Sequence, residues 1–170
     1  MPILTQYVQD QLGHKDLVII APDAGRVKLV RKFAQKVGAP YALLEKERPA
    51  QQVAEIGYVI GDVKGKTALI VDDIIDTAGT LAAAAQTVLD AGATRVFAAA
   101  THAVFSGNAW ENLAGAGFEK VVVTDTIPLR PGAPDNVEVL SCSPLLADTI
   151  RRIVTDGSVS EVFGGENQLF

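Results

Sequence analysis

Residues 72–80 are dense in side chains that could do chemistry: three carboxylates, two threonines and a glycine occur within nine positions. An apolar run of strand length, residues 68–71, precedes this segment, and a stretch rich in Ala and Leu, typical of a helix, begins at Leu81. In open α/β sheets, a polar loop between a strand and a helix directs backbone N–H groups and the positive end of the helix dipole at a bound anion. Residues 72–80, the aspartate loop, are therefore predicted to bind an anion.

The residue types in the aspartate loop suit a sugar phosphate. The hydroxyl groups of Thr77 and Thr80 can donate hydrogen bonds to phosphate oxygens, and Gly79 lets the backbone approach the ligand or adopt a positive φ. Asp72 and Asp73 repel phosphate, but they can accept hydrogen bonds from vicinal ribose hydroxyls, directly or through a hydrated magnesium ion. A phosphate at one end and a diol at the other describe a ribose 5-phosphate.

A plain helix N-cap formed by Asp76 and Thr77 is the alternative interpretation of this segment. One such residue is enough for a cap, so the alternative leaves the other polar residues unexplained. We therefore expect ribose 5-phosphate to be bound by Asp72, Asp73, Asp76, Thr77, Ala78, Gly79 and Thr80.

A second turn, residues 22–25, also follows an apolar run, and the carboxyl ends of parallel strands meet at one sheet edge. We therefore expect this turn to lie beside the aspartate loop. Its backbone N–H groups can bind a second phosphate, and Asp23 can hold a cation. An ordinary strand-to-helix turn with Asp23 as N-cap is the alternative.

The elements that must position these turns alternate along the chain. Apolar runs predict strands at residues 17–21, 41–44, 67–71, 95–101, 120–124 and 137–140. Helical periodicity predicts helices at residues 2–12, 27–37 (ended by Gly38), 81–91, 108–115 and 143–155. Residues 45–58 are polar and are expected to be mobile at their start. This alternation predicts one α/β domain over residues 1–170: an open parallel sheet with helices on both faces, a Rossmann-like three-layer arrangement.

The composition narrows the class of protein. The chain has 170 residues, 48% of them hydrophobic, and a formal net charge of −5, which disfavours nucleic acid and anionic membranes as partners. A single cysteine, Cys142, excludes an internal disulfide. Neither a signal-peptide pattern nor an apolar run of membrane-spanning length is present, which predicts a cytoplasmic protein.

The same residues carry a resemblance to a known family. Residues 71–80 resemble the phosphoribosyl-diphosphate (PRPP) motif of the type I phosphoribosyltransferase fold. Other segments resemble the ribose-phosphate pyrophosphokinases (PRPP synthetases) nearly end to end: VIIAPDAG (18–25), KERP (46–49), IGDV (60–63), ATH (100–102), VTDTIPL (123–129) and SVS (158–160). The match corresponds to the C-terminal half of that family's usual chain, so we expect a truncated chain or a natural half-length homologue.

The resemblance implies a reaction in which diphosphate moves from ATP to the C1 hydroxyl of ribose 5-phosphate, giving PRPP and AMP. It implies magnesium as the cofactor, held by Asp23, Asp72 and Asp73. It also implies a homo-oligomer, in which the half missing here and an adjacent subunit complete the nucleotide site. The isolated chain is therefore expected to bind ribose 5-phosphate weakly and to have little synthetase activity alone.

The resemblance assigns Asp23, Ala24 and Gly25 to the pyrophosphate side of PRPP. Many family members have a second glycine where this chain has Arg26. This departure predicts either a direct contact between Arg26 and phosphate or an altered geometry of the turn.

Lys46 and Arg48 match the outer positions of a Lys-Arg-Arg loop that supplies catalytic charge in the family. Phosphoryl transfer needs charge neutralisation on the transferring group, so both are candidate catalytic residues. The central position is Glu47 and Glu45 precedes the loop, so two carboxylates would offset the cations. A solvated charged turn is the alternative.

Ser158 and Ser160 resemble the family's site for a regulatory phosphate or nucleotide, and a frayed tail is the alternative. Two other functions remain open for the whole chain. A phosphoribosyltransferase would use the aspartate loop to consume PRPP, although no aromatic-rich segment for base recognition is visible. A non-catalytic partner would regulate a full-length PRPP synthetase.

Overall fold

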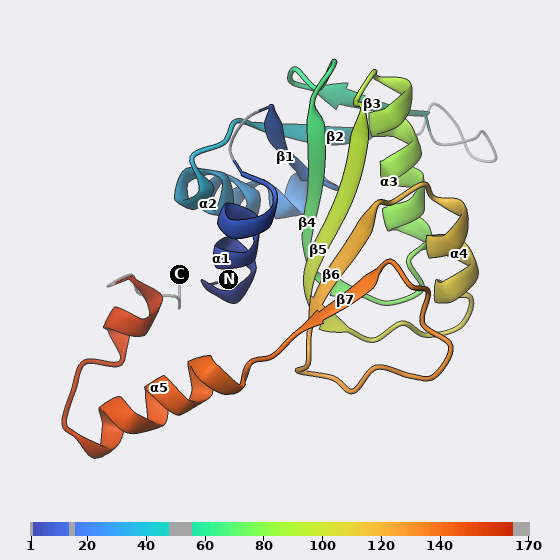
Figure 1. Cartoon of the computed structure of the whole chain (residues 1–170). Helices are drawn as coiled ribbons and strands as arrows, with labels where there is room; N and C mark the ends of the chain where they lie inside the picture. Colours follow the sequence, from blue (N-terminus) through green and yellow to red (C-terminus); the bar gives the residue numbers. More distant parts are fainter. Residues whose placement is uncertain (1, 14–15, 48–55, 165–170) are drawn as a thin grey trace.

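The computed structural model describes residues 2–13, 16–47 and 56–164, which fold around a seven-stranded sheet (Figure 1). The strands are β1 (Leu17–Ala21), β2 (Tyr41–Glu47), β3 (Ile56–Ile60), β4 (Thr67–Ile75), β5 (Arg95–Ala103), β6 (Lys120–Thr124) and β7 (Val137–Leu140). The helices are α1 (Pro2–Gln11), α2 (Val27–Val37), α3 (Gly79–Asp90), α4 (Ala109–Gly115) and α5 (Ser143–Val154), with short 3-10 turns η1 (Ala24–Arg26) and η2 (Ser160–Phe163). The strand order is β3-β2-β1-β4-β5-β6-β7.

Six of the strands, in the spatial order β2-β1-β4-β5-β6-β7, are parallel to one another, as the alternation of strands and helices predicts. Helices α1 and α2 cover one face, and α3 and α4 cover the other (Figure 1). Successive residues of β4 therefore enter opposite cores: Ile70 packs on the α3 side, and Leu69 and Val71 pack on the α2 side. Because both faces of the central strands are buried, their sequences are continuously apolar. The predicted α/β sandwich is confirmed.

The edge of the sheet differs from the prediction. Residues 45–58 were expected to be a polar segment, yet β2 continues to Glu47 and β3 returns antiparallel to it, with Leu44 opposite Val59. Residues 48–55, between these strands, lie outside the described residues. Strand β3 lies at the edge of the sheet and pairs on one side only, and its Tyr58 and Ile60 side chains are exposed, so its hydrophobic pattern is weak.

Strand β4 also extends further than the predicted residues 67–71. Its pairing with β5 continues through Asp72 opposite Ala100 and Ile74 opposite His102. The prediction ended the strand at the first carboxylate, and it was wrong because main-chain pairing does not depend on side-chain polarity. As a consequence, Asp72 and Asp73 lie on a rigid strand and not in a loop.

Helix α5 leaves the body of the protein after β7 and contributes no buried residue (Figure 1). Four large apolar side chains on it are more than half exposed: Leu146, Ile150, Ile153 and Val154. Within the described residues, no helix combines the length and the apolar character needed to cross a bilayer.

Candidate functional site

The carboxyl ends of the adjacent parallel strands β1 and β4 border a cavity of about 240 Å³. One lining residue comes from the turn after β1, and the others come from the end of β4, the aspartate loop and the first turn of α3. The structure thus brings together the two turns that the sequence places at one sheet edge. The lining residues are Asp23, Asp72, Ile74, Ile75, Asp76, Thr77, Ala78, Thr80 and Leu81.

The aspartate loop enters α3 through a conformation that residues with a side chain rarely adopt. Ala78, the N-cap of α3, has φ 60° and ψ 3°, which costs roughly 1–2 kcal/mol for a non-glycine residue. The positive φ therefore falls on Ala78 and not on Gly79, which begins the helix together with Thr80. The first N–H groups of a helix have no intrahelical acceptor, so those of this turn can donate to a bound anion.

Two polar contacts from outside the loop hold it in place. The side-chain amide of Asn112 in α4 donates to the carbonyl of Thr77 at 2.8 Å, and the hydroxyl of Ser106 donates to Oδ1 of Asp76. Sequence reasoning missed both Asn112 and Ser106. The only signal in the sequence is that Ser106 follows the carboxyl end of a strand, where ligand sites gather in such sheets.

Arg26 reaches across from the turn after β1 and contacts both aspartates at the end of β4. Its Nε lies 2.8 Å from Oδ1 of Asp72, and its Nη2 lies 2.7 Å from Oδ1 of Asp73. Oδ1 of Asp72 also accepts a hydrogen bond of 2.8 Å from the backbone N–H of Asp73. The sequence predicted a phosphate contact or an altered turn for Arg26, and the structure places its guanidinium on the carboxylate pair.

Burial dominates the electrostatics of Asp72. It raises the pKa of Asp72 from 3.8 to about 6, and the neighbouring Asp73 carboxylate acts in the same direction. The Asp73 N–H and the Arg26 guanidinium oppose this rise in the pKa. A carboxylate that is both desolvated and next to a like charge is typical of a functional site.

The turn after β1 adopts the capped form that was the alternative interpretation. Asp23 is the N-cap of η1, and its Oδ1 accepts a hydrogen bond of 3.1 Å from the backbone N–H of Arg26. A Cβ on Gly25 would lie 3.1 Å from the same oxygen, so glycine suits this position. Asp23 also lines the cavity, while Ala24 and Gly25 do not line it.

The donor set has the right chemistry for magnesium, which proteins bind through one or two carboxylates together with water and substrate phosphates. Asp72 and Asp73 can supply such oxygens, but both Oδ1 atoms are paired with Arg26. No group of three or more potential metal-binding side chains converges anywhere in the described residues. Asp23 and Asp72 line the same cavity, and the assignment of Asp23, Asp72 and Asp73 as metal ligands stays a prediction.

The remaining predicted catalytic residues cannot be located at this site. The backbone of Lys46 lies in β2, where it pairs with Gly57, but its side chain lies outside the described part of the structure. Arg48 lies wholly outside the described residues. Their assignment as catalytic residues stays a prediction.

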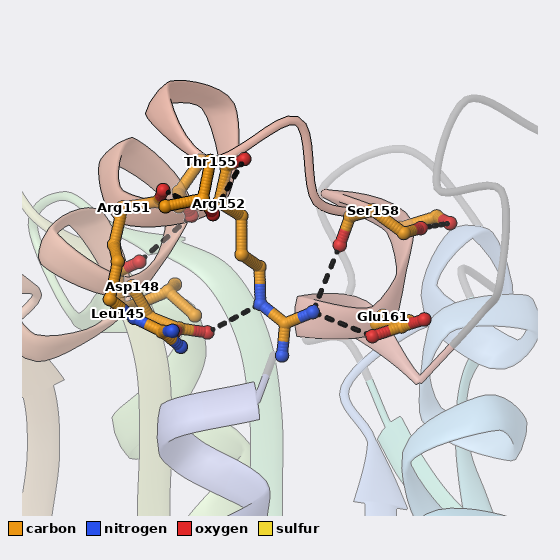
Figure 2. Close-up of polar contacts among 9 residues, drawn as sticks. Leu145, Asp148, Arg151, Arg152, Thr155, Ser158 and Glu161 are labelled. Atoms are coloured by element: carbon orange, nitrogen blue, oxygen red, sulfur yellow. Dashed lines mark hydrogen bonds and ion pairs between the residues drawn. The ribbon is translucent and has the colours of Figure 1, made fainter.

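The predicted regulatory serines lie after α5, remote from the cavity in sequence and on different elements. Oγ of Ser158 and Oγ of Ser160 are 2.9 Å apart and hydrogen-bonded. The guanidinium of Arg152 holds this segment: it contacts Asp148 at 2.9 Å, Glu161 at 2.7 Å and the Ser158 carbonyl at 3.1 Å (Figure 2). The segment is thus anchored to α5 and is not a frayed tail. Its role in binding a regulatory phosphate stays a prediction.

Comparisons with known proteins show the family of the chain. Residues 34–164 match the family model of the phosphoribosyl synthetase-associated domain. The ribose-phosphate pyrophosphokinase of Caldanaerobacter subterraneus is 48% identical over 163 residues, which cover 95% of this chain and 52% of that protein. The corresponding protein of Clostridium acetobutylicum is 45% identical over 168 residues, covering 98% of this chain and 53% of the relative. The chain thus spans about half the length of the curated relatives it matches.

Solved structures support the same relationship. The phosphoribosylpyrophosphate synthetase from Mycobacterium smegmatis superposes with a TM-score of 0.81 at 40% identity, covering 91% of this chain and 50% of that one. The orotate phosphoribosyltransferase from Aeropyrum pernix shares the fold alone. It superposes with a TM-score of 0.55 at 24% identity, covering 69% of this chain and 64% of that one. The resemblance read from the sequence is confirmed, and the chain belongs to the ribose-phosphate pyrophosphokinase (PRPP synthetase) family.

Proposed function

We propose that this chain is the sugar-phosphate-binding part of a ribose-phosphate diphosphokinase and corresponds to the C-terminal half of the longer relatives. One observation carries the proposal. The cavity beside β1 and β4 is lined by a carboxylate, Asp72, and by two hydroxyl side chains at the start of α3, Thr77 just before the helix and Thr80 in its first turn. This arrangement suits a ligand with a diol and a phosphate, namely ribose 5-phosphate.

In this proposal the aspartate loop binds and orients the sugar. Asp72 and Asp73 accept hydrogen bonds from the ribose 2- and 3-hydroxyls, and residues 76–80 bind the 5-phosphate. The C1 hydroxyl then attacks the β-phosphorus of ATP, the bond from that phosphorus to the α–β bridging oxygen breaks, and AMP leaves. The proton of the C1 hydroxyl is lost in the same step, which gives PRPP.

Charge on the transferring diphosphate is the main electrostatic demand of this reaction. Lys46 and Arg48 are proposed to supply positive charge, and the Asp23–Gly25 turn is proposed to bind the pyrophosphate through its N–H groups. A magnesium ion bound at Asp72 and Asp73 would supply further positive charge. The ATP-binding groups that complete the site are proposed to come from the other half of a longer chain or from another subunit.

A non-catalytic role is the second candidate. Arg26 neutralises the carboxylates that would face the ribose. This observation favours a protein that binds a phosphate or nucleotide and regulates a full-length synthetase, with Ser158 and Ser160 as part of its phosphate site. Co-purification with a full-length PRPP synthetase would support this candidate.

We further propose a cytoplasmic homo-oligomer that binds neither nucleic acid nor membranes. The net charge of −5 supports the absence of polyanionic partners. The exposed apolar face of α5, formed by Leu146, Ile150 and Ile153, supports self-association, because a second copy is the partner always present in solution.

Calorimetric titration with ribose 5-phosphate and magnesium, run beside an assay of AMP release from ATP, tests the proposal. Asp72→Asn and Asp73→Asn should each weaken ribose 5-phosphate binding by about tenfold or more, because each replaces a charged carboxylate acceptor with a neutral amide that accepts more weakly and donates from its NH2 group. Asp90→Asn, at the far end of α3 from the loop, is the matched control and should bind like the wild type.

The outcomes separate the candidates. Binding without AMP release supports a sugar-phosphate half that needs its nucleotide half, and AMP release supports a site completed between subunits. An absence of ribose 5-phosphate binding in the wild type would contradict the assignment of the aspartate loop. If the two aspartate variants bind ribose 5-phosphate more weakly and also melt at a clearly lower temperature, these side chains act on stability and not on the ligand.

A further inference from the structure

Arg26 lies in the turn after β1, and its side chain bridges two carboxylates of β4, those of Asp72 and Asp73. Its backbone is anchored at the end of η1, where its N–H donates to Oδ1 and to the carbonyl of Asp23 at 3.1 and 3.2 Å. From this anchor the side chain spans to the end of β4, with Nε at Asp72 and Nη2 at Asp73. One planar cation thus contacts one oxygen of each carboxylate.

The two carboxylates need a cation near them. Asp72 and Asp73 are neighbours in sequence, their side chains are 23% and 38% exposed, and like charges so close repel each other in a partly desolvated site. The guanidinium offsets part of this repulsion. A divalent metal at the same place would offset it more completely, because it carries twice the charge.

The guanidinium and a metal ion would compete for the same two carboxylates. Arg26 contacts Oδ1 of each, and a magnesium ion that used these oxygens would have to approach them to about 2.0–2.1 Å. Both cations cannot occupy those oxygens together. Oδ1 of Asp73 is buried and accepts no hydrogen bond of good geometry from the described residues, so its contact with Arg26 is an ion pair without a directional bond.

We propose that Arg26 is an intramolecular cation that takes the place of a divalent metal ion at Asp72 and Asp73 and competes with the metal for them. Metal binding then requires the guanidinium to leave, so the affinity of the pair for divalent cations is lowered by the stability of the Arg26 contacts. The consequence for ribose 5-phosphate rests on the function proposed above: the wild type depends less on metal for sugar binding than a variant without Arg26.

Titration of the full chain with Mn²⁺, with free Mn²⁺ followed by electron paramagnetic resonance and no sugar phosphate present, tests the competition directly. Mn²⁺ is the probe because it accepts the same octahedral oxygen ligands as magnesium. Arg26→Gln should bind Mn²⁺ about tenfold or more tightly than the wild type, since a competing ion pair is removed. Arg26→Gly, which removes the whole side chain, should show the same gain.

Two controls define the origin of the gain. Arg95 is the first residue of β5 and forms an ion pair with Glu119, at the end of the sheet opposite to Asp72 and Asp73. Arg95→Gln removes the same charge as Arg26→Gln and should leave Mn²⁺ affinity within about twofold of the wild type. Adding Asp72→Asn to Arg26→Gln should abolish the gain. Circular dichroism and the melting temperature establish that each variant is folded.

The proposal is overturned if folded Arg26→Gln and Arg26→Gly bind Mn²⁺ no more tightly than Arg95→Gln, or if the gain persists without Asp72. A parallel titration with ribose 5-phosphate separates this result from the proposed function. Tighter Mn²⁺ binding with no ribose 5-phosphate binding in any variant supports the role of Arg26 and contradicts the function. Unchanged Mn²⁺ binding with intact ribose 5-phosphate binding does the reverse.

Discussion

The side-chain amide of Asn112 donates a hydrogen bond of 2.8 Å to the backbone carbonyl of Thr77, and it ties α4 to the loop that begins α3. Thr77 directly precedes Ala78, whose positive φ is the least favourable backbone conformation in the loop. A contact made by a side chain 35 positions away thus helps to hold the loop open toward the cavity. Preorganisation of this kind lowers the entropy that a ligand would otherwise lose on binding.

Replacing Asn112 with Ala should therefore weaken ligand binding more than it weakens the fold. We expect ribose 5-phosphate affinity to fall by several-fold and the free energy of unfolding to fall by about 1 kcal/mol, the usual contribution of one such hydrogen bond. Calorimetry and urea unfolding measure the two effects. Gln86→Ala, which removes an exposed amide contact with Asp90 on α3, is the control and should leave affinity unchanged. Equal affinity in Asn112→Ala would mean that the loop needs no support from α4.

The raised pKa of Asp72 predicts a pH dependence of stability. The folded protein holds the Asp72 proton up to about pH 6, whereas the unfolded chain releases it near 3.8. The stabilisation from this group is therefore fully present below pH 3.8 and is lost as the pH rises through 6. Between pH 4.5 and 7.5, the stability of the wild type relative to Asp72→Asn should fall by up to about 2 kcal/mol in urea unfolding.

A second carboxylate gives a control of opposite sign. Hydrogen bonds from the backbone N–H of Cys142 and the hydroxyl of Ser141 lower the pKa of Asp125. Its stabilisation is present above pH 3.8 and is lost only as the pH falls below that value. The advantage of the wild type over Asp125→Asn should therefore not decline between pH 4.5 and 7.5. A parallel decline in both comparisons would contradict the assignment to Asp72.

The connection between β3 and β4 contains two glycines, Gly61 and Gly65, and substitution of Gly61 should cost more stability. Gly61 has φ +128°, and a Cβ there would lie 2.7 Å from the Cβ of Ala42 in the neighbouring strand. Gly61→Ala should cost about 2–4 kcal/mol, because overpacking and backbone strain act together. Gly65, with φ +74°, faces open space, so Gly65→Ala should cost about 1 kcal/mol. Denaturant unfolding measures both, and equal costs would mean that β2 shifts to accept the methyl group.

The exposed apolar face of α5 predicts self-association. Ile150 and Ile153 are 61% and 60% exposed on a helix that contributes nothing to the core. Replacing Ile150 and Ile153 with Glu should convert an oligomer into a monomer, as measured by light scattering coupled to size exclusion, because charge on a buried interface is costly. Tyr58→Glu, at the opposite sheet edge, is the control and should leave the oligomer intact. A monomeric wild type would contradict the proposed homo-oligomer.

Local pattern was sufficient for much of the fold. The bounds of β1, β6, β7 and α2 agree with the predicted ranges, and α2 ends at Gly38 with φ 72° as expected. Continuous apolar runs and a left-handed glycine report on their own residues, so they can be read without knowing what lies beside them. The same holds for the aspartate loop, whose polar residues stand between a recognisable strand and helix.

The sequence by itself determined the α/β class, the order of the strands and helices other than β3, and the edge of the sheet at which Asp23 and the aspartate loop meet. Only the tertiary structure decided that β3 pairs with β2, that β4 runs on through both aspartates and that Arg26 lies on their carboxylates. It also decided that Asn112 supports Thr77. Each of these features joins segments that are distant in sequence, through main-chain pairing or a long side chain. Neither mechanism constrains the residue types enough to leave a local pattern. Main-chain groups are common to all residues, and Arg and Asn side chains are usually exposed to solvent, so their sequence positions do not reveal a tertiary contact.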